Sequence, residues 1–171
     1  LSHEKGFLDL IDVFSLINKE DNECILHIIG DGEEITKIEE KINELNLKDK
    51  VILYGYKDKE FIREKLNDMS LYLMTSYEES FGLTTVEGMA CGTPSIVYNR
   101  TASPELVSEG TGFIVEAGDI NGVIECMKFI KDKGKNSYVR PCRERAELLF
   151  DKDKNFMQYL SLYDNLINNN H

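Results

Sequence analysis

The sequence contains no tryptophan and only three histidines and four cysteines among its 171 residues. The histidines are too far apart along the chain to form a metal-binding motif, and no Cys-x-x-Cys pair occurs. A chain with scattered cysteines and no signal peptide is typical of a cytoplasmic protein with reduced thiols. We therefore expect no metal site, no disulfide framework, no bound cofactor and a cytoplasmic location. The scattered residues are His3, His27, His171, Cys24, Cys91, Cys126 and Cys142.

Basic charge and long apolar runs are also scarce. Lysine and arginine number 20 against 31 acidic residues, which gives a net charge of −11. This balance argues against a nucleic-acid partner, and any anion site must be built from local N–H groups and a few cations. The apolar run 25–29 contains His27 and is far shorter than the roughly 20 residues of a transmembrane helix. No Gly-x-Gly-x-x-Gly follows a strand-like run, which disfavours a nicotinamide-dependent enzyme.

Helical and strand-like apolar patterns alternate along the chain. The spacing of apolar residues predicts helices over 4–18, 35–45, 59–68, 83–91, 104–107 and 119–131, with two more between 138 and 167. Continuous short apolar runs predict strands over 24–29, 51–54, 71–74, 95–98 and 112–115. This alternation is typical of an α/β fold, a Rossmann-like doubly wound parallel sheet with helices on both faces. The length predicts a single domain over 1–171, closed by a last helix within 150–171 that we expect Phe156, Tyr159, Leu160, Tyr163 and Leu166 to anchor.

The segment 76–94, SYEESFGLTTVEGMACGTP, carries the clearest indication of a site. A polar loop with Glu79 ends at Phe81 and Gly82, and the predicted helix that follows carries Glu87 about one turn inside. The amides near Phe81, Gly82 and Leu83 have no partner within that helix and would attract a phosphate. Two carboxylates flanking such a site suit the diols of a nucleotide sugar, although an acidic residue near a helix N-terminus is favourable on dipole grounds alone.

Several glycine-containing loops are predicted to lie on the same edge of the sheet. Ligands of open parallel sheets bind beyond the carboxyl ends of the strands. The loops at Gly30-Asp31-Gly32, at Gly55 and Tyr56, at 75–82 and at 99–104 would all lie there. Gly30 and Gly32 taken alone are better explained as turn residues.

The run Glu79-Ser80-Phe81-Gly82, followed by Glu87-Gly88-Met89-Ala90-Cys91-Gly92-Thr93-Pro94, resembles the E-x7-E signature of group 1 (family 4) glycosyltransferases. Further similarities extend over nearly the whole chain. They are the pair Lys5-Gly6, the turn Gly30-Asp31-Gly32, Gly55, and the segments 103–107 and 110–115.

This resemblance implies the C-terminal, donor-binding half of a GT-B enzyme. Such an enzyme transfers a glycosyl group from a nucleotide-diphosphate sugar to an acceptor hydroxyl, with retention and without a metal, in polysaccharide or glycolipid synthesis. The resemblance gives the catalytic roles to Glu79, which would hold the sugar hydroxyls, and to Lys5, which would contact the phosphates. Glu87 would bind the ribose. The rest of the expected donor site is Ser80, Phe81, Gly82, Leu83, Gly30, Gly55 and Tyr56.

Two departures from the family pattern concern the start of the chain. The family's phosphate-binding arginine, five residues before the lysine, falls before Leu1 together with its strand, and the N-terminal acceptor domain is also absent. We therefore expect a fragment whose first strand is missing, which self-associates through unpaired sheet edges. The isolated domain would be inactive, and the full-length enzyme could lie at the inner face of a membrane.

An alternative remains open. A non-catalytic nucleotide-binding or regulatory Rossmann-like module would explain the alternation of helices and strands equally well. It would not explain why Glu79 and Glu87 bracket Phe81 and Gly82.

Overall fold

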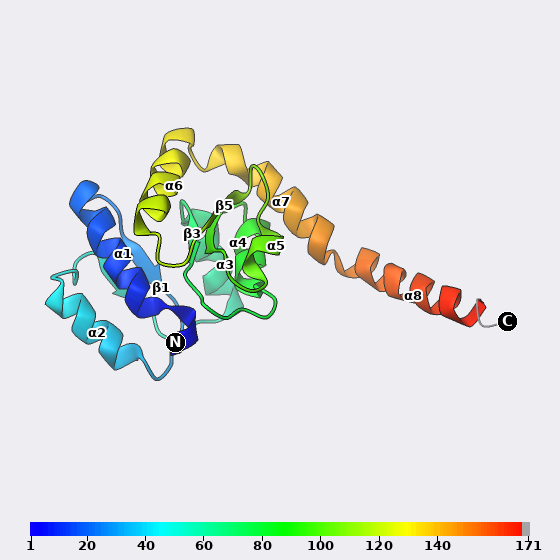
Figure 1. Ribbon diagram of the computed structural model, residues 1–171, viewed down its shortest axis with the longest axis horizontal. Helices are drawn as coiled ribbons and strands as arrows, with labels where there is room; N and C mark the ends of the chain where they lie inside the picture. Colours follow the sequence, from blue (N-terminus) through cyan, green and yellow to red (C-terminus); the bar gives the residue numbers. More distant parts are fainter. Residues whose placement is uncertain (169–171) are drawn as a thin grey trace.

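The protein folds as alternating helices and parallel strands, shown in Figure 1. The computed structural model describes residues 1–168. The elements are a 3-10 turn His3–Lys5, α1 Phe7–Glu20, β1 Leu26–Ile28, α2 Ile35–Glu44, β2 Val51–Leu53, α3 Lys59–Asp68, β3 Tyr72–Met74, α4 Leu83–Ala90, β4 Ser95–Tyr98, α5 Ser103–Leu106, β5 Gly112–Val115, α6 Ile120–Lys133, α7 Asn136–Phe150 and α8 Lys152–Asn168. The predicted α/β class is confirmed.

The strands form two separate parallel ladders. β1 pairs with β2, and β3, β4 and β5 pair in that order. The single continuous sheet that the sequence predicts is therefore interrupted between β1 and β3. A cavity of about 1050 Å³ lies at the interruption and is lined by residues of both β1 and β3.

Helices cover the strands on two sides. Figure 1 shows α1, α2 and α6 on one side of the strands and α3, α4 and α7 on the other, and contacts join α1 to α2 and α6, and α4 to α3 and α7. α1 spans both ladders: its Ile11 and Phe14 pack in the core of β1, β2 and α2, whereas Val13 and Ile17 pack in the core around β4 and α6. Because burial of each such side chain is worth about 1.5–3 kcal/mol, α1 holds the two halves together.

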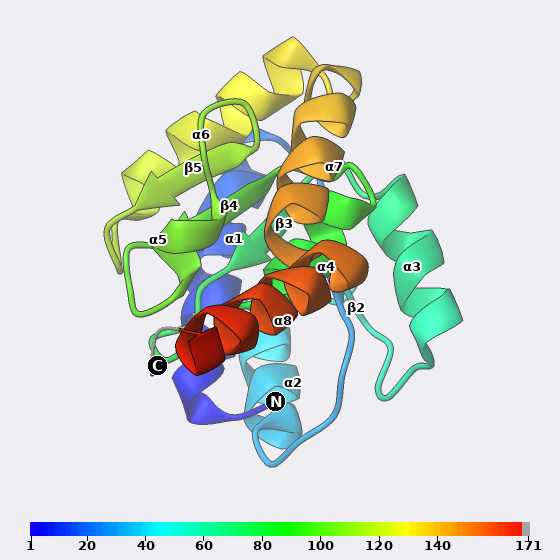
Figure 2. The ribbon, with the colours of Figure 1, turned by 90° about the vertical axis from the view of Figure 1, so that its right-hand side faces the viewer.

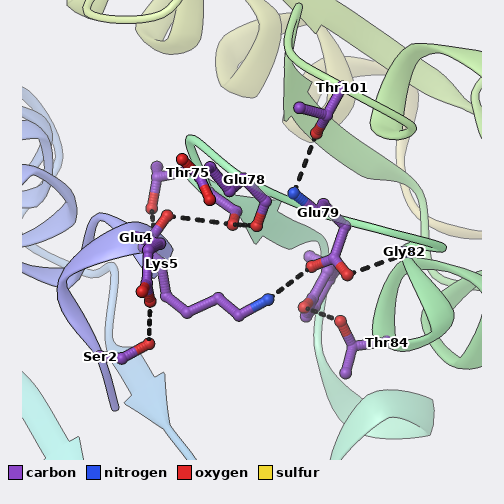
Figure 3. A network of polar contacts seen from close by, with 11 residues as sticks. Ser2, Glu4, Lys5, Thr75, Glu78, Glu79, Gly82, Thr84 and Thr101 are labelled. Atoms are coloured by element: carbon purple, nitrogen blue, oxygen red, sulfur yellow. Dashed lines mark hydrogen bonds and ion pairs between the residues drawn. The ribbon is translucent and has the colours of Figure 1, made fainter.

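The first helix begins later than the sequence predicts. The periodic apolar pattern suggested a start near residue 4, but α1 runs from Phe7 to Glu20. Gly6 adopts the left-handed conformation, with φ +66°, and this ends the 3-10 turn His3–Lys5 before α1 starts. The change of direction at Gly6 turns the side chain of Lys5 away from the axis of α1 and toward the loop that follows β3 (Figure 3).

The expected anchoring of the last helix is wrong. The side chains of Phe156, Tyr159, Leu160, Tyr163 and Leu166 are between 42% and 63% exposed, and none of the described residues of α8 is buried. Figure 1 shows α8 extending away from the rest of the molecule beyond α7, and Figure 2 shows the same helix running obliquely in front of the other elements. The sequence pattern defines an apolar face on a helix, but it does not supply a surface that buries it. Residues 169–171, the end of the predicted closing segment, lie outside the described part.

None of the helices within residues 1–168 combines the length and the apolar character that crossing a membrane requires.

Candidate functional site

The site is built around the loop that joins β3 to α4. This loop carries Glu79 and ends at Gly82, which has φ +64°. A Cβ at Gly82 would lie 2.4 Å from Cδ1 of Leu106, so both the backbone conformation and the space favour glycine here. The first hydrogen bond within α4 runs from the amide of Val86 to the carbonyl of Gly82, at 3.2 Å. The amides at the start of α4 therefore precede the helix's own ladder and face the loop.

Lys5 and Glu79 form an ion pair at the centre of this site. The Lys5 Nζ lies 2.7 Å from Glu79 Oε2, and the Gly82 amide donates to Glu79 Oε1 at 3.3 Å (Figure 3). Burial raises the pKa of Glu79, but the hydrogen bonds from Lys5 and from the Gly82 amide outweigh it and hold the pKa below its usual value. The Glu79 carboxylate is therefore ionised at neutral pH and held between a cation and a helix N-terminus.

Hydrogen bonds to the loop after β3 bring Lys5 to this position. Thr75 Oγ1 shares its hydrogen bond between the carbonyls of Lys5 and Gly6, at 3.3 and 3.2 Å. Ser76 Oγ and the amide of Tyr77 both donate to the carbonyl of Glu4, at 3.1 and 2.7 Å. The turn before α1 and the loop after β3 are consequently one hydrogen-bonded unit, although about 70 residues separate them in the sequence.

Most of the predicted site residues surround the mouth of one cavity. It is lined at the carboxyl ends of the strands by Lys5, Gly30, Asp31, Glu79, Phe81, Leu83, Thr84 and Glu87. Glu87 is exposed on α4, and the side chains of Phe81 and Leu83 are exposed beside it. The cavity volume of 1050 Å³ also includes the apolar space between β1 and β3. The polar site therefore occupies only part of this cavity.

Four predicted residues do not line this cavity. Gly55 lies next to it, because its carbonyl accepts a hydrogen bond from the Gly30 amide at 2.9 Å. Tyr56 is highly exposed, Ser80 is exposed, and Gly82 is buried behind the cavity wall as the N-cap of α4. The structure thus brings the two glutamates, Lys5 and Gly30 together and leaves Tyr56 and Ser80 at the periphery.

Sequence reasoning missed two polar contacts of the site. Thr101 Oγ1 accepts a hydrogen bond from the Glu79 amide at 2.9 Å, and the Tyr72 hydroxyl donates to Thr84 Oγ1 at 2.9 Å. Thr101 lies in the loop 99–104 after β4, which the sequence predicts at this edge, but no pattern marks Thr101 within that loop. Tyr72 occupies the first position of a strand, where an aromatic residue is typical of any sheet.

No group of three or more potential metal-binding side chains occurs within residues 1–168. Metal independence stays a prediction.

The family model for glycosyl transferases group 1 matches residues 1–148 of the chain. The parallel-stranded α/β fold agrees with this match. The chain belongs to the group 1 glycosyltransferases.

Individual relatives agree with this assignment. The chain is 32% identical over 162 residues to an N-acetyl-alpha-D-glucosaminyl L-malate synthase of Bacillus anthracis, covering 93% of this chain and 42% of that protein. The solved structure of sucrose-phosphate synthase from Thermosynechococcus elongatus superimposes with a TM-score of 0.83 at 26% identity, covering 97% of this chain and 43% of the other. A variant of TarM from S. aureus, crystallised with UDP, Fondaparinux and alpha-GlcNAc-glycerol, gives a TM-score of 0.83 at 25% identity and covers 95% of this chain and 33% of that one. The chain therefore spans less than half the length of these proteins.

Proposed function

We propose that this chain binds a nucleotide-diphosphate sugar and that the protein to which it belongs transfers the sugar to an acceptor hydroxyl. The observation that carries the proposal is the contact between Lys5 Nζ and the Glu79 carboxylate at the N-terminus of α4. One cation, one ionised carboxylate and a row of helix-start amides lie on one cavity mouth with Glu87. Those groups match the diphosphate, the sugar hydroxyls and the ribose of such a donor.

Each group has a distinct role in the proposed reaction. The bond between the sugar's anomeric carbon and the diphosphate breaks, the acceptor oxygen bonds to that carbon and loses its proton, and the nucleoside diphosphate leaves with added negative charge. Lys5 and the amides at the start of α4 stabilise this charge. Glu79 accepts hydrogen bonds from the sugar, and Glu87 accepts them from the ribose.

Retention and independence of metal belong to the same proposal. The name of the B. anthracis relative specifies an alpha-linked sugar in its product. Transfer from an alpha-linked donor to an alpha-linked product is retention. Lys5 supplies positive charge at the place where a metal would otherwise neutralise the phosphates.

A binding experiment tests the donor site. Thermal shift and calorimetry with nucleoside diphosphates and their sugar esters should identify one base, and Glu87→Ala should abolish the response. Ligand at ten times its dissociation constant adds about 1.4 kcal/mol, or roughly 3–6 °C for this size. Glu125→Ala, an exposed glutamate of α6, is the matched control and should leave the shift unchanged. Absence of any response in the unsubstituted protein overturns the proposal.

Replacing the sugar-binding carboxylate tests the transfer step in the full-length enzyme. Glu79→Gln keeps the shape but loses the negative charge, so we expect kcat to fall at least tenfold. The isolated chain should not transfer sugar, because it lacks the facing surface that would bind an acceptor and exclude water. Unchanged kinetics of Glu79→Gln contradict the assigned role.

Partners and location complete the proposal. The acceptor would be a saccharide or glycolipid bound by the rest of the protein. The cysteines are free thiols, which supports a cytoplasmic protein, with the full-length enzyme associating with the inner face of a membrane. The edges of β1 and β3 that face the cavity would pair with strands of a second copy.

A further inference from the structure

Thr101 adopts a backbone conformation that threonine rarely tolerates. Its φ is +48°, and within residues 1–168 Asn46 is the only other non-glycine residue with a positive φ. Asparagine enters the left-handed region readily, but a β-branched side chain does so at a real cost. Such strain persists only where surrounding interactions impose it, and it concentrates at functional sites.

The interactions at Thr101 all lead to Glu79. The Thr101 hydroxyl oxygen accepts from the Glu79 amide at 2.9 Å (Figure 3). The Ala102 amide donates to the Glu79 carbonyl at 3.3 Å. Both backbone polar groups of Glu79 are thus bound by two consecutive residues of the loop after β4. A second hydrogen bond, from the Ser103 amide to the Arg100 carbonyl at 3.3 Å, closes that loop around Thr101.

The opposite side of Glu79 is held by different groups. Lys5 and the Gly82 amide bind the carboxylate, whereas Thr101 and Ala102 bind the backbone. The neighbouring side chains of Glu78, Ser80 and Phe81 are exposed, so packing does little to fix this part of the loop. The Ser76 hydroxyl, which donates to the Glu78 carbonyl at 2.8 Å, holds the residue before Glu79. The backbone of Glu79 itself, from which the carboxylate projects, is held by the loop after β4.

We propose that Thr101 is a positioning residue that aims the Glu79 carboxylate at the sugar of the donor. The proposal rests on the donor site described above and adds a second loop, after β4, to its construction. The left-handed backbone of Thr101 places its hydroxyl oxygen within hydrogen-bond distance of the Glu79 amide. Thr101 itself does not line the cavity.

Three substitutions separate positioning from a general structural role. Thr101→Val keeps the shape and the strain but removes the acceptor oxygen, Thr101→Ser keeps the oxygen, and Thr101→Gly removes both the oxygen and the strain. NMR titration of the Glu79 carboxyl reads the geometry directly: we expect its pKa to rise toward the ordinary value in Thr101→Val and Thr101→Gly, and to stay unchanged in Thr101→Ser. Thr36→Val, on the exposed face of α2, is the matched control.

Ligand affinity supplies the functional readout. Calorimetry uses UDP, ADP and GDP and their glucose esters, and compares the sugar ester with the free diphosphate for the base that the unsubstituted protein prefers. Thr101→Val and Thr101→Gly should weaken the sugar ester about tenfold and leave the diphosphate within twofold. Thr101→Gly should do so while its Tm stays equal or rises, a combination that simple destabilisation does not produce.

The outcomes distinguish the two proposals. An unchanged Glu79 pKa, or an unchanged ratio of the two affinities, in Thr101→Val overturns the positioning role and leaves the donor site standing. Failure of the unsubstituted protein to bind every probe overturns the donor site, and the functional role of Thr101 falls with it.

Discussion

The Lys5 Nζ lies 2.7 Å from the Glu79 carboxylate, although the two residues are 74 positions apart in the sequence. Lys5 lies in the 3-10 turn before α1, and Glu79 lies in the loop between β3 and α4. They meet because the left-handed Gly6 turns the chain at Lys5, and because Thr75 and Ser76 bind the backbone of that turn.

This contact predicts a pH dependence of stability. The pKa of Glu79 lies below its unfolded value, so the pair contributes stability above about pH 4.5 and loses it as the pH falls through the lowered folded pKa. Lys5→Met should remove this contribution and flatten the decline in unfolding free energy below pH 4.5. Because Lys5 is 40% exposed, we expect a difference below about 1 kcal/mol at pH 7.

Urea unfolding from pH 3 to 7 measures the effect. The difference between the two proteins should shrink as the pH falls. A difference that stays constant over this range would show that Lys5 acts through packing, and the double substitution with Glu79→Gln checks the coupling.

A second prediction concerns Gly6 and its close approach to the loop after β3. A Cβ there would lie 2.3 Å from the carbonyl oxygen of Thr75, a backbone atom that cannot move alone. Gly6→Ala should therefore lower the unfolding free energy by about 2–4 kcal/mol and separate Lys5 from Glu79.

Gly55→Ala is the matched control for Gly6→Ala. Gly55 has φ +65°, nearly equal to the +66° of Gly6, but a Cβ at Gly55 meets nothing within 4 Å. Its substitution should cost only the conformational strain, about 1 kcal/mol. Chemical denaturation measures the unfolding free energy of both variants. Equal decreases at the two positions would mean that the close approach to Thr75 does not add to the destabilisation.

Removal of the last helix should leave the body of the protein intact. None of the described residues of α8 is buried, so ending the chain at Asp151 removes no core contact. We expect Tm to change by less than about 2 °C in calorimetry. A loss of more than about 2 kcal/mol would show that α8 folds back onto the body in solution.

The interrupted sheet predicts self-association. The ladder groups of β1 and β3 on the cavity side have no strand beside them in the described structure, and such edges pair with other chains. Sedimentation velocity from 10 to 500 μM should show a sedimentation coefficient that rises with concentration. A strictly monomeric, cooperatively folding species over this range would contradict the prediction.

Much of the fold could be predicted from the sequence because it depends on local patterns. The bounds of α3, β4 and β5 match the prediction to the residue, since each is a dense apolar or amphipathic run with polar residues or glycine at its ends. The expected E-x7-E pair also lies where a loop and the following helix meet, because eight residues of spacing span that junction.

The sequence by itself determined the class of fold, the order of its elements, the family, and the segment on which the proposed site lies, because each of these is written in residues close together along the chain. Only the tertiary structure decided that the sheet is divided between β1 and β3, that α8 leaves its apolar face exposed, and that Thr101 holds the backbone of Glu79. These features depend on which distant segments meet in space. Hydrogen bonds over 22 and 74 residues have no local signature, and an apolar face on a helix specifies a need for burial without specifying the partner.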